Sequence, residues 1–249
     1  MHILEEILSK KKKIECPYQR TRKIYSFSDA IKNKNKKGKI ALIAEIKSRS
    51  PSRGEIQKIK NIKELARVYQ ENGATCISIL TEENYFGGSI HDLRVVSENC
   101  TIPILRKDFI TDLDEIKDTY NVNADCLLLI TSIVGPNLKN YLAECETLGI
   151  EALVEVHTKN EVTNALHAGA KIIGINNRNL DTFEVNLDTT NELIGYIPDD
   201  VVVISESGIS KKEDIKYLSQ RINAVLVGTE IMKSINTAEK VEELSSVTY

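Results

Sequence analysis

Eight short runs of apolar, mostly β-branched residues follow one another along this chain, and they constrain its fold more than any other feature. The runs begin at Ile40, Thr75, Pro103, Asp125, Ala152, Ile172, Val201 and Ala224. Between them lie segments with helical periodicity, three of which end near Gly73, Gly149 and Gly169, where a left-handed helix cap is expected. A strand followed by a helix, repeated eight times, predicts an all-parallel sheet.

The runs are apolar at both odd and even positions, as expected for strands with both faces buried. Eight such units in a chain of 249 residues match a closed (β/α)₈ TIM barrel, for which ~250 residues is typical. An open doubly wound sheet is the alternative. It would usually carry a glycine-rich dinucleotide-binding turn after its first strand, where this chain reads KSRSPSRGE. We therefore expect residues 1–249 to form a single barrel domain, with residues 1–38 as a helical N-terminal extension.

The N-terminal extension carries two helix signals. Leu4, Ile7 and Leu8 have helical spacing, and a second short helix is expected around residues 27–31. A lysine-rich stretch follows, which we interpret as a solvated loop rather than a binding patch. Its members are Lys32, Lys34, Lys36, Lys37 and Lys39.

Composition excludes several classes of function. The chain has 33 basic and 36 acidic residues and a net charge of −3, so no broad attraction to nucleic acid is indicated. Its five cysteines lack metal-ligand spacing and a disulfide pattern, which predicts reduced thiols, with Cys76 and Cys126 buried. The N-terminus does not resemble a signal peptide, and no run approaches the ~20 apolar residues that cross a membrane. We therefore expect a soluble, cytoplasmic protein with neither nucleic acid nor membrane as a partner.

Charged and amide side chains recur at the ends of the apolar runs. They are Glu45, Lys47, Lys107, Glu155, Asn176, Arg178 and Glu206. Residues two apart in a strand point the same way, so Glu45 and Lys47 share a face, as do Asn176 and Arg178. If those faces point into the barrel, the set forms a ring at its carboxyl end, where such barrels carry out their chemistry. A purely structural ion network would show the same alternation of charge.

The last two strand ends suggest an anion site. Ser207, Gly208, Gly228 and Thr229 offer backbone N–H groups with little steric obstruction, and the loops after strands seven and eight of these barrels commonly bind phosphate. The sequence therefore predicts a small phosphorylated substrate, although both glycines could simply make tight turns. Glu230 would repel an anion, so its side chain is expected to point away.

Several stretches together identify a family. They read IAEIKSRSPSRGEI, SILTEENYFGGSIHDL, PILRKDFI, LGIEALVEVHTKNEV, IGINNRNL, VVISESGI and VLVGTEIM. In combination they closely resemble indole-3-glycerol phosphate synthase of tryptophan biosynthesis, from about Ile40 to Met232. The N-terminal segment is similar to the helical extension that members of this family carry before the first strand.

The resemblance implies a carboxy-lyase that needs no cofactor and no metal. The reaction converts 1-(2-carboxyphenylamino)-1-deoxyribulose 5-phosphate to indole-3-glycerol phosphate with loss of carbon dioxide and water. It implies that Lys107 is the general acid at the ketone oxygen, that Glu155 is its partner in proton removal and dehydration, and that Glu45 and Lys47 complete the proton transfers. The division of dehydration between Lys47 and Lys107 is left open, as is any association with other enzymes of the pathway.

The same resemblance implies the substrate contacts. Arg178 and Asn176 hold the substrate, Glu206 lies on the floor of the pocket, and phosphate binds at residues 207, 208, 228 and 229. Phe86 and Phe109 shape the pocket for the anthranilate ring, although either could be an ordinary core residue. Ser50 contacts the substrate carboxylate when an exposed, mobile loop over residues 48–54 closes.

Two other functions remain to be compared. Phosphoribosylanthranilate isomerase is also a phosphate-binding barrel, but it would place a cysteine near the end of the first strand, where this chain has Glu45 and Lys47. A non-catalytic phosphosugar-binding barrel is expected if the charges within the barrel serve only structure.

Overall fold

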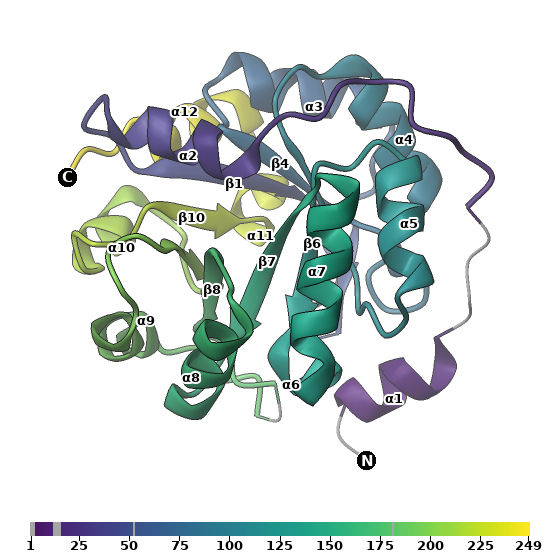
Figure 1. The fold of residues 1–249 in the computed structure, drawn as a ribbon. Helices are drawn as coiled ribbons and strands as arrows, with labels where there is room; N and C mark the ends of the chain where they lie inside the picture. Colours follow the sequence, from purple (N-terminus) through teal and green to yellow (C-terminus); the bar gives the residue numbers. More distant parts are fainter. Residues whose placement is uncertain (1–2, 12–15, 52, 181) are drawn as a thin grey trace.

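The strands of this protein close into a parallel barrel, as the alternating sequence pattern predicts. The computed structural model describes residues 3–11, 16–51, 53–180 and 182–249 (Figure 1). Around the barrel the strands follow the order β1-β4-β5-β6-β7-β8-β9-β10, and β10 pairs with β1 to close it. The strands are β1 (Ala41–Ile46), β4 (Cys76–Leu80), β5 (Ile104–Lys107), β6 (Cys126–Ile130), β7 (Glu151–Val156), β8 (Ile172–Asn176), β9 (Val202–Glu206) and β10 (Ala224–Val227).

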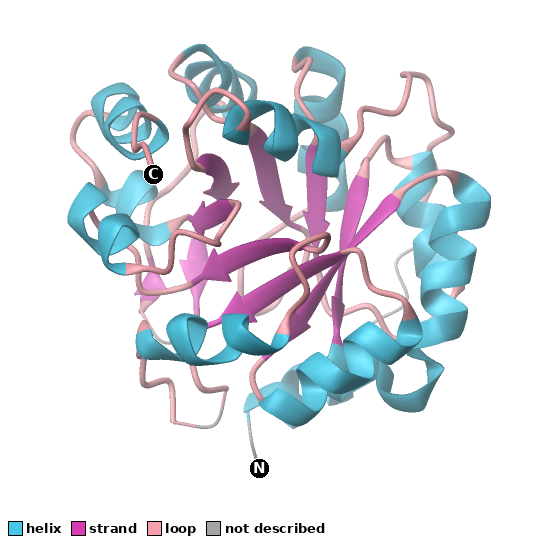
Figure 2. Cartoon of the chain, turned by 60° about the vertical axis from the view of Figure 1, so that its left-hand side comes forward, coloured by secondary structure: helices cyan, strands magenta, loops and turns pink. Residues whose placement is uncertain are grey.

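Helices follow every barrel strand and form an outer layer around the sheet (Figure 2). They are α3 (Ile62–Glu71), α4 (Ile90–Asn99), α5 (Asp114–Asn121), α6 (Thr131–Val134), α7 (Leu138–Leu148), α8 (Lys159–Ala168), α9 (Asp188–Leu193), α10 (Lys212–Tyr217), α11 (Thr229–Lys233) and α12 (Thr237–Ser245), with 3₁₀ turns at Gly135–Asn137 and Ile194–Tyr196. The three predicted glycine caps are confirmed, since Gly73, Gly149 and Gly169 all have positive φ.

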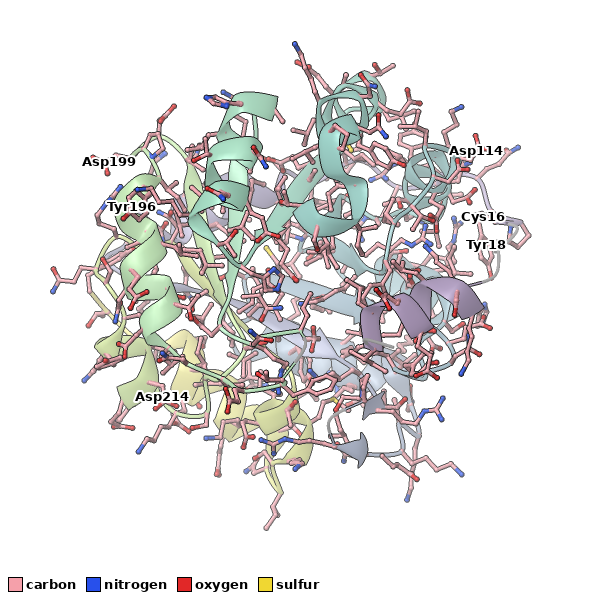
Figure 3. The ribbon with its side chains drawn as sticks, turned by 90° about the horizontal axis from the view of Figure 1, so that it is seen from below. Cys16, Tyr18, Asp114, Tyr196, Asp199 and Asp214 are labelled. Atoms are coloured by element: carbon pink, nitrogen blue, oxygen red, sulfur yellow. The ribbon has the colours of Figure 1, made fainter. Side chains whose placement is uncertain are left out.

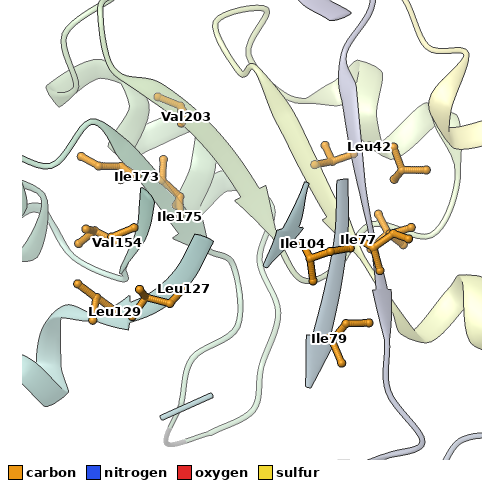
Figure 4. Packing of buried hydrophobic residues seen from close by; sticks show 14 of the residues in the cluster. Leu42, Ile77, Ile79, Ile104, Leu127, Leu129, Val154, Ile173, Ile175 and Val203 are labelled. Carbon is orange, nitrogen blue, oxygen red and sulfur yellow. The ribbon is translucent and has the colours of Figure 1, made fainter. Parts of the chain in front are cut away.

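Two apolar cores lie on the two faces of the strands. Leu42, Ala44 and Ile46 of β1 belong to the cluster between the barrel and its helices, of which part is drawn in Figure 4. Ala41 and Ile43 belong to a second cluster inside the barrel. This alternation with a period of two explains why every position of the strand is apolar until Glu45.

Helix α2 (Phe27–Asn35) closes the amino-terminal end of the barrel. Its Phe27 and Ile31 are fully buried in the inner cluster. Ser26 caps the helix by accepting from the Asp29 backbone N–H, and the carboxylate of Glu151 accepts further N–H groups of the first turn, that of Phe27 among them. Because strand β7 provides this carboxylate, the helix is fixed to the barrel end.

The lysine-rich stretch is only partly the loop that the sequence indicates. Helix α2 continues to Asn35, so Lys32 and Lys34 are helical, and only the remaining lysines follow the helix. The loop prediction was wrong for these two residues because lysine is a good helix former, and its charge is favourable near a helix C-terminus.

After α1 (Ile3–Lys10), residues 20–25 are anchored by a buried ion-pair network at the same end of the barrel as α2. Asp125 is fully buried and forms two ion pairs. Its Oδ1 lies 2.8 Å from Arg20 Nη2, and its Oδ2 lies 2.9 Å from Arg22 Nη2. It also accepts the backbone N–H groups of Tyr25 and Ile104. The two N-terminal helices consequently lie at opposite ends of the barrel, with α1 at the carboxyl end of the strands (Figure 1).

The cysteines are free, as predicted. Four of them are buried, Cys76 and Cys126 among them. Cys16 is half-buried and lies beside Tyr18 at the periphery of the molecule (Figure 3). Within the described part of the chain, no helix is both long and apolar enough to cross a membrane, and no group of three or more His, Cys, Asp or Glu side chains is placed to hold a metal ion.

Candidate active site

A cavity of about 440 Å³ opens at the carboxyl end of the barrel strands. With one exception, Glu206, all of the residues predicted from the sequence line it. They are Glu45, Lys47, Ser50, Phe86, Lys107, Phe109, Glu155, Asn176, Arg178, Ser207, Gly208, Gly228 and Thr229. The structure therefore brings together residues that lie far apart in the sequence.

Strand alternation places the charged side chains inside the barrel. Glu45 has the parity of Ala41 and Ile43, and Lys107 has that of Leu105, all of which belong to the inner cluster. Glu155 follows Leu153 in the same way. The apolar inner residues thus fill the barrel from below, and the charged residues occupy the uppermost inward position of β1, β5 and β7.

Lys107 is the centre of an ion-pair network. Its Nζ lies 2.6 Å from Glu206 Oε2 and 3.5 Å from Glu45 Oε2. Burial would lower the pKa of Lys107, but the charges of Glu206, Glu45 and Glu155 outweigh burial and raise it above the ordinary value. The lysine is therefore an ammonium ion at neutral pH and can donate a proton.

Glu45 also forms an ion pair with a second lysine, Lys47. Its Oε1 lies 2.6 Å from Lys47 Nζ. Burial would raise the pKa of Glu45, but the charges of Lys47 and Lys107 lower it, so the carboxylate is ionised. Gly228 makes room for it, since a Cβ atom there would lie 2.4 Å from Glu45 Oε1. The absence of a side chain at this position thus serves the packing of Glu45, in addition to any contact with a ligand.

Glu155 and its neighbours form the next part of the wall. The Nδ2 of Asn176 donates to Glu155 Oε1 at 3.1 Å, and the Oδ1 of the same amide accepts the Arg178 backbone N–H at 3.0 Å. The Arg178 side chain is held in turn by the carbonyl oxygen of Phe183. Asn176 therefore orients a carboxylate on one side and the arginine segment on the other.

Glu206, predicted to lie on the floor of the pocket, is not among the residues that line the cavity and lies beneath them. The residue is fully buried, and its Oε2 is covered by the Lys107 ammonium at 2.6 Å. Burial raises its pKa to about 7, against the opposing charge of Lys107. Gly174 of β8 is essential to this packing, because a Cβ atom there would lie 2.2 Å from Glu206 Oε1.

The predicted phosphate loops lie side by side on neighbouring strands β9 and β10. Ser207 and Gly208 both have positive φ, of 66° and 86°. A left-handed conformation is uncommon for a non-glycine residue and is frequent at binding sites. The expectation for Glu230 was wrong: it lines the cavity, and its Oε1 lies 3.7 Å from Arg53 Nη1, so a cation offsets its charge.

The two aromatic residues face each other across the cavity wall. The ring centroids of Phe86 and Phe109 are 5.9 Å apart. Buried Glu82 fixes the loop that carries Phe86, by accepting the backbone N–H groups of Asn84, Tyr85 and Phe86. Both rings are half-buried and line the cavity, so neither is an ordinary core residue.

The segment after β1 contributes to the cavity wall. Its short strands β2 (Arg49–Ser50) and β3 (Gly54–Glu55) pair as an antiparallel hairpin. Ser50 is buried, and its Oγ has no hydrogen-bond partner among the described residues. A buried hydroxyl without a partner on a cavity wall is well placed to bind a polar ligand group. Ser52 of the predicted lid lies outside the described residues.

Some residues of the site were not predicted. Ile3, Leu4 and Ile7 of helix α1 line the cavity, although their helical spacing alone gave no sign of that location. His157 lies against Glu155, with Nε2 3.3 Å from Glu155 Oε1. Its position two residues beyond Glu155, on the same face of the strand, was a signal in the sequence that could have revealed it.

Comparison with known proteins decides the family. The family model described as indole-3-glycerol phosphate synthase matches residues 2–244. The chain belongs to the indole-3-glycerol phosphate synthase family. Among its relatives of that name, the protein of Acetivibrio thermocellus is 44% identical over 223 residues, which cover 89% of this chain and 85% of that protein. The one of Aquifex aeolicus is 42% identical in an alignment of 259 positions, gaps included, that covers 98% of this chain and 99% of that protein. The chain is thus an indole-3-glycerol phosphate synthase, a decarboxylating lyase of tryptophan biosynthesis with a phosphorylated small-molecule substrate.

Solved structures of other enzymes share the barrel. A 3-hexulose-6-phosphate synthase matches with a TM-score of 0.63 at 15% identity, covering 83% of this chain and 99% of that one. A thiamine phosphate pyrophosphorylase from Pyrococcus furiosus matches with a TM-score of 0.61 at 15% identity, covering 84% and 96%. At such identities the likeness concerns the fold alone.

Proposed function

We propose that this enzyme closes the indole ring with Lys107 as the general acid. In the substrate, 1-(2-carboxyphenylamino)-1-deoxyribulose 5-phosphate, the ring carbon that bears the carboxylate attacks the ketone carbon. Lys107 donates a proton to the ketone oxygen as it becomes a hydroxyl group, carbon dioxide leaves the ring carbon, and water is then lost. The observation that carries this proposal is the buried ammonium group of Lys107 on the cavity wall, held by Glu206 and Glu45.

The same geometry supports roles for the other charged residues. Glu155 removes a proton or assists loss of the hydroxyl group during dehydration, since its carboxylate lines the cavity and is oriented by Asn176. Glu45 and Lys47 exchange protons with this network through their 2.6 Å contact. Proton transfer by positioned side chains of this kind contributes typically ~10²–10⁴ in rate.

The two ends of the substrate are bound on different sides of the cavity. We assign the phosphate to the backbone of residues 207, 208, 228 and 229, and the anthranilate ring to Phe86 and Phe109. Ser50 and Arg178 bind polar groups of the substrate, and Lys47 lies near its carboxylate. Holding both ends brings the ring carbon to the ketone, which is where binding energy accelerates a cyclisation.

The remaining expectations are proposals of the same kind. We propose that the enzyme works in the cytoplasm without nucleic-acid partners, which the free thiols and the net charge of −3 support. We also propose that residues 1–249 form one domain with residues 1–38 as its extension.

Substitution of Lys107 by alanine tests the acid role. We expect kcat to fall at least ~10²-fold while the variant remains folded and still binds substrate. Turnover is followed by the fluorescence of the indole product, against a low background because the chain has no tryptophan. Lys139→Ala, at an exposed position on α7, is the matched control.

The outcomes separate the alternatives. Undiminished turnover in Lys107→Ala would reject the acid role. Absence of turnover in the unmodified protein, with substrate bound, would favour a phosphosugar-binding barrel. Turnover of a phosphoribosylanthranilate instead would indicate the isomerase.

A further inference from the structure

His157 is a buried, titratable side chain that the proposed mechanism does not use. It follows strand β7 directly, and 14% of its side chain is exposed. Its Nε2 lies 3.3 Å from Glu155 Oε1 and its Nδ1 lies 3.7 Å from Glu161 Oε2. The imidazole therefore stands between a carboxylate of the site and a carboxylate of α8. It does not belong to the cavity wall, so it acts on the reaction only through its neighbours.

The position of the imidazole is determined by the start of helix α8. Thr158 and Glu161 form a capping box there, in which each side chain accepts the backbone N–H of the other residue. The same Glu161 carboxylate accepts the His157 backbone N–H at 2.6 Å. This double use of one carboxylate fixes both the backbone of His157 and the charge that faces its Nδ1.

The ring lies close to carboxylates without forming an aligned hydrogen bond to them. Neither ring nitrogen has an aligned hydrogen-bond partner within the described part of the chain. The charged groups with the largest influence on the ring are three carboxylates: Glu155 on β7, Glu161 on α8 and Glu206 on β9. Burial would lower the pKa of His157, but the contact with Glu161 and the charges of these three carboxylates raise it. The imidazolium form therefore persists to higher pH than in a free histidine.

We propose that His157, as an imidazolium ion, is a positioning residue that keeps the Glu155 carboxylate aimed into the cavity. The inference rests on the proposed role of Glu155 in proton transfer. Asn176 orients the same oxygen atom at 3.1 Å but is neutral, whereas His157 contacts this atom and can carry a positive charge. A cation within ion-pair distance stabilises the charged form of a carboxylate and extends its use as a base to lower pH.

Protonation of the four histidines can be read directly from long-range ¹H–¹⁵N correlation spectra of the full chain. The His157 signal is assigned by its loss in His157→Asn. We expect it to titrate above the ordinary value of ~6.5 and to move to lower pH in Glu155→Gln. Coupling between the two groups is reciprocal, so an unchanged titration in Glu155→Gln would overturn the proposal. This measurement needs no turnover, so it can fail independently of the proposed function.

Kinetics test the consequence for the reaction. In His157→Asn we expect the acidic limb of the plot of kcat against pH to move to higher pH by about one unit. The KM should stay close to that of the unmodified enzyme. Glu161→Gln keeps the helix cap and should shift the limb in the same direction by less. His167→Asn, at an exposed histidine of α8, should leave the profile unchanged.

Two kinetic outcomes would contradict the proposal. One is an acidic limb that stays in place in folded His157→Asn. The other is a uniform fall of kcat at every pH, which would indicate a purely structural role. If His157→Asn does not fold, the titration in Glu155→Gln and the profile of Glu161→Gln decide the question.

Discussion

Substitution of Gly174 by alanine tests how tightly the floor of the active site is packed. A Cβ atom at this position would lie 2.2 Å from Glu206 Oε1, whereas ordinary contacts begin at 3.4 Å. The carboxylate must therefore retreat by about 1.2 Å, the difference between these two distances. Leu153 Cδ1 lies 3.0 Å from the added atom on another side, so the backbone has little room to move instead.

Displacement of Glu206 would also disturb its ion pair with Lys107. Their contact of 2.6 Å would lengthen beyond hydrogen-bonding distance if the carboxylate moved directly away. Overpacking of a core typically costs about 1–3 kcal/mol, which for a chain of this size lowers Tm by roughly 2–12 °C. Misplacement of a catalytic group by about 1 Å can reduce kcat ~10²-fold. We therefore expect both stability and turnover to fall.

Thermal unfolding monitored by circular dichroism measures the loss of stability. The fluorescence of the indole product measures the loss of turnover. Gly195→Ala is the matched control, because a Cβ atom there meets nothing within 4 Å and the residue lies in a 3₁₀ turn. It should be neutral or stabilise by about 0.4–1 kcal/mol. Wild-type Tm and kcat in Gly174→Ala would refute the reasoning, as would an equal loss in the control.

Three further substitutions address other parts of the molecule. Asp125→Ala leaves buried Arg20 without its partner and should cost roughly 3–5 kcal/mol in urea denaturation, with kcat unchanged because the site is at the other end of the barrel. The pKa of Glu206 is raised in the folded protein, which therefore favours the neutral side chain more than the unfolded chain does. The stability of the wild-type protein consequently falls as pH rises from about 4.5 to about 7. Glu206→Gln should consequently gain stability relative to wild type between pH 5 and pH 8, and a constant difference would contradict this. Lys11 joins the end of α1 to the loop after β5 and to Glu115 of α5. Lys11→Ala should therefore raise KM several-fold through loss of the α1 wall, with less effect on kcat; an unchanged KM would show that α1 docks without it.

Much of the site could be predicted because strand parity is a local property. Glu45, Lys107 and Glu155 each end an apolar strand, and their parity in the sequence places them on the inner face. Closure of the barrel then brings the ends of all strands together, whatever their separation in the chain. The charged residues at the strand ends were therefore accessible from the pattern, and the family from its motifs.

What the pattern could not reveal depends on contacts between distant elements. Glu206 has the same parity as the others, yet the Lys107 ammonium covers it, and only the packed arrangement distinguishes a wall residue from one beneath it. The pairing of Glu230 with Arg53 likewise joins two loops that the sequence does not relate.

The sequence by itself determined the eightfold alternation, the inward face of each strand and the family, because periodicity and motifs are written in neighbouring residues. Tertiary structure alone decided that α1 forms a wall of the cavity, that Gly174 and Gly228 leave room for two carboxylates, and that His157 stands between Glu155 and Glu161. These features are matters of distance between atoms of different elements. They arise only when the barrel closes, since closure sets which side chains share a buried volume and which charges face one another.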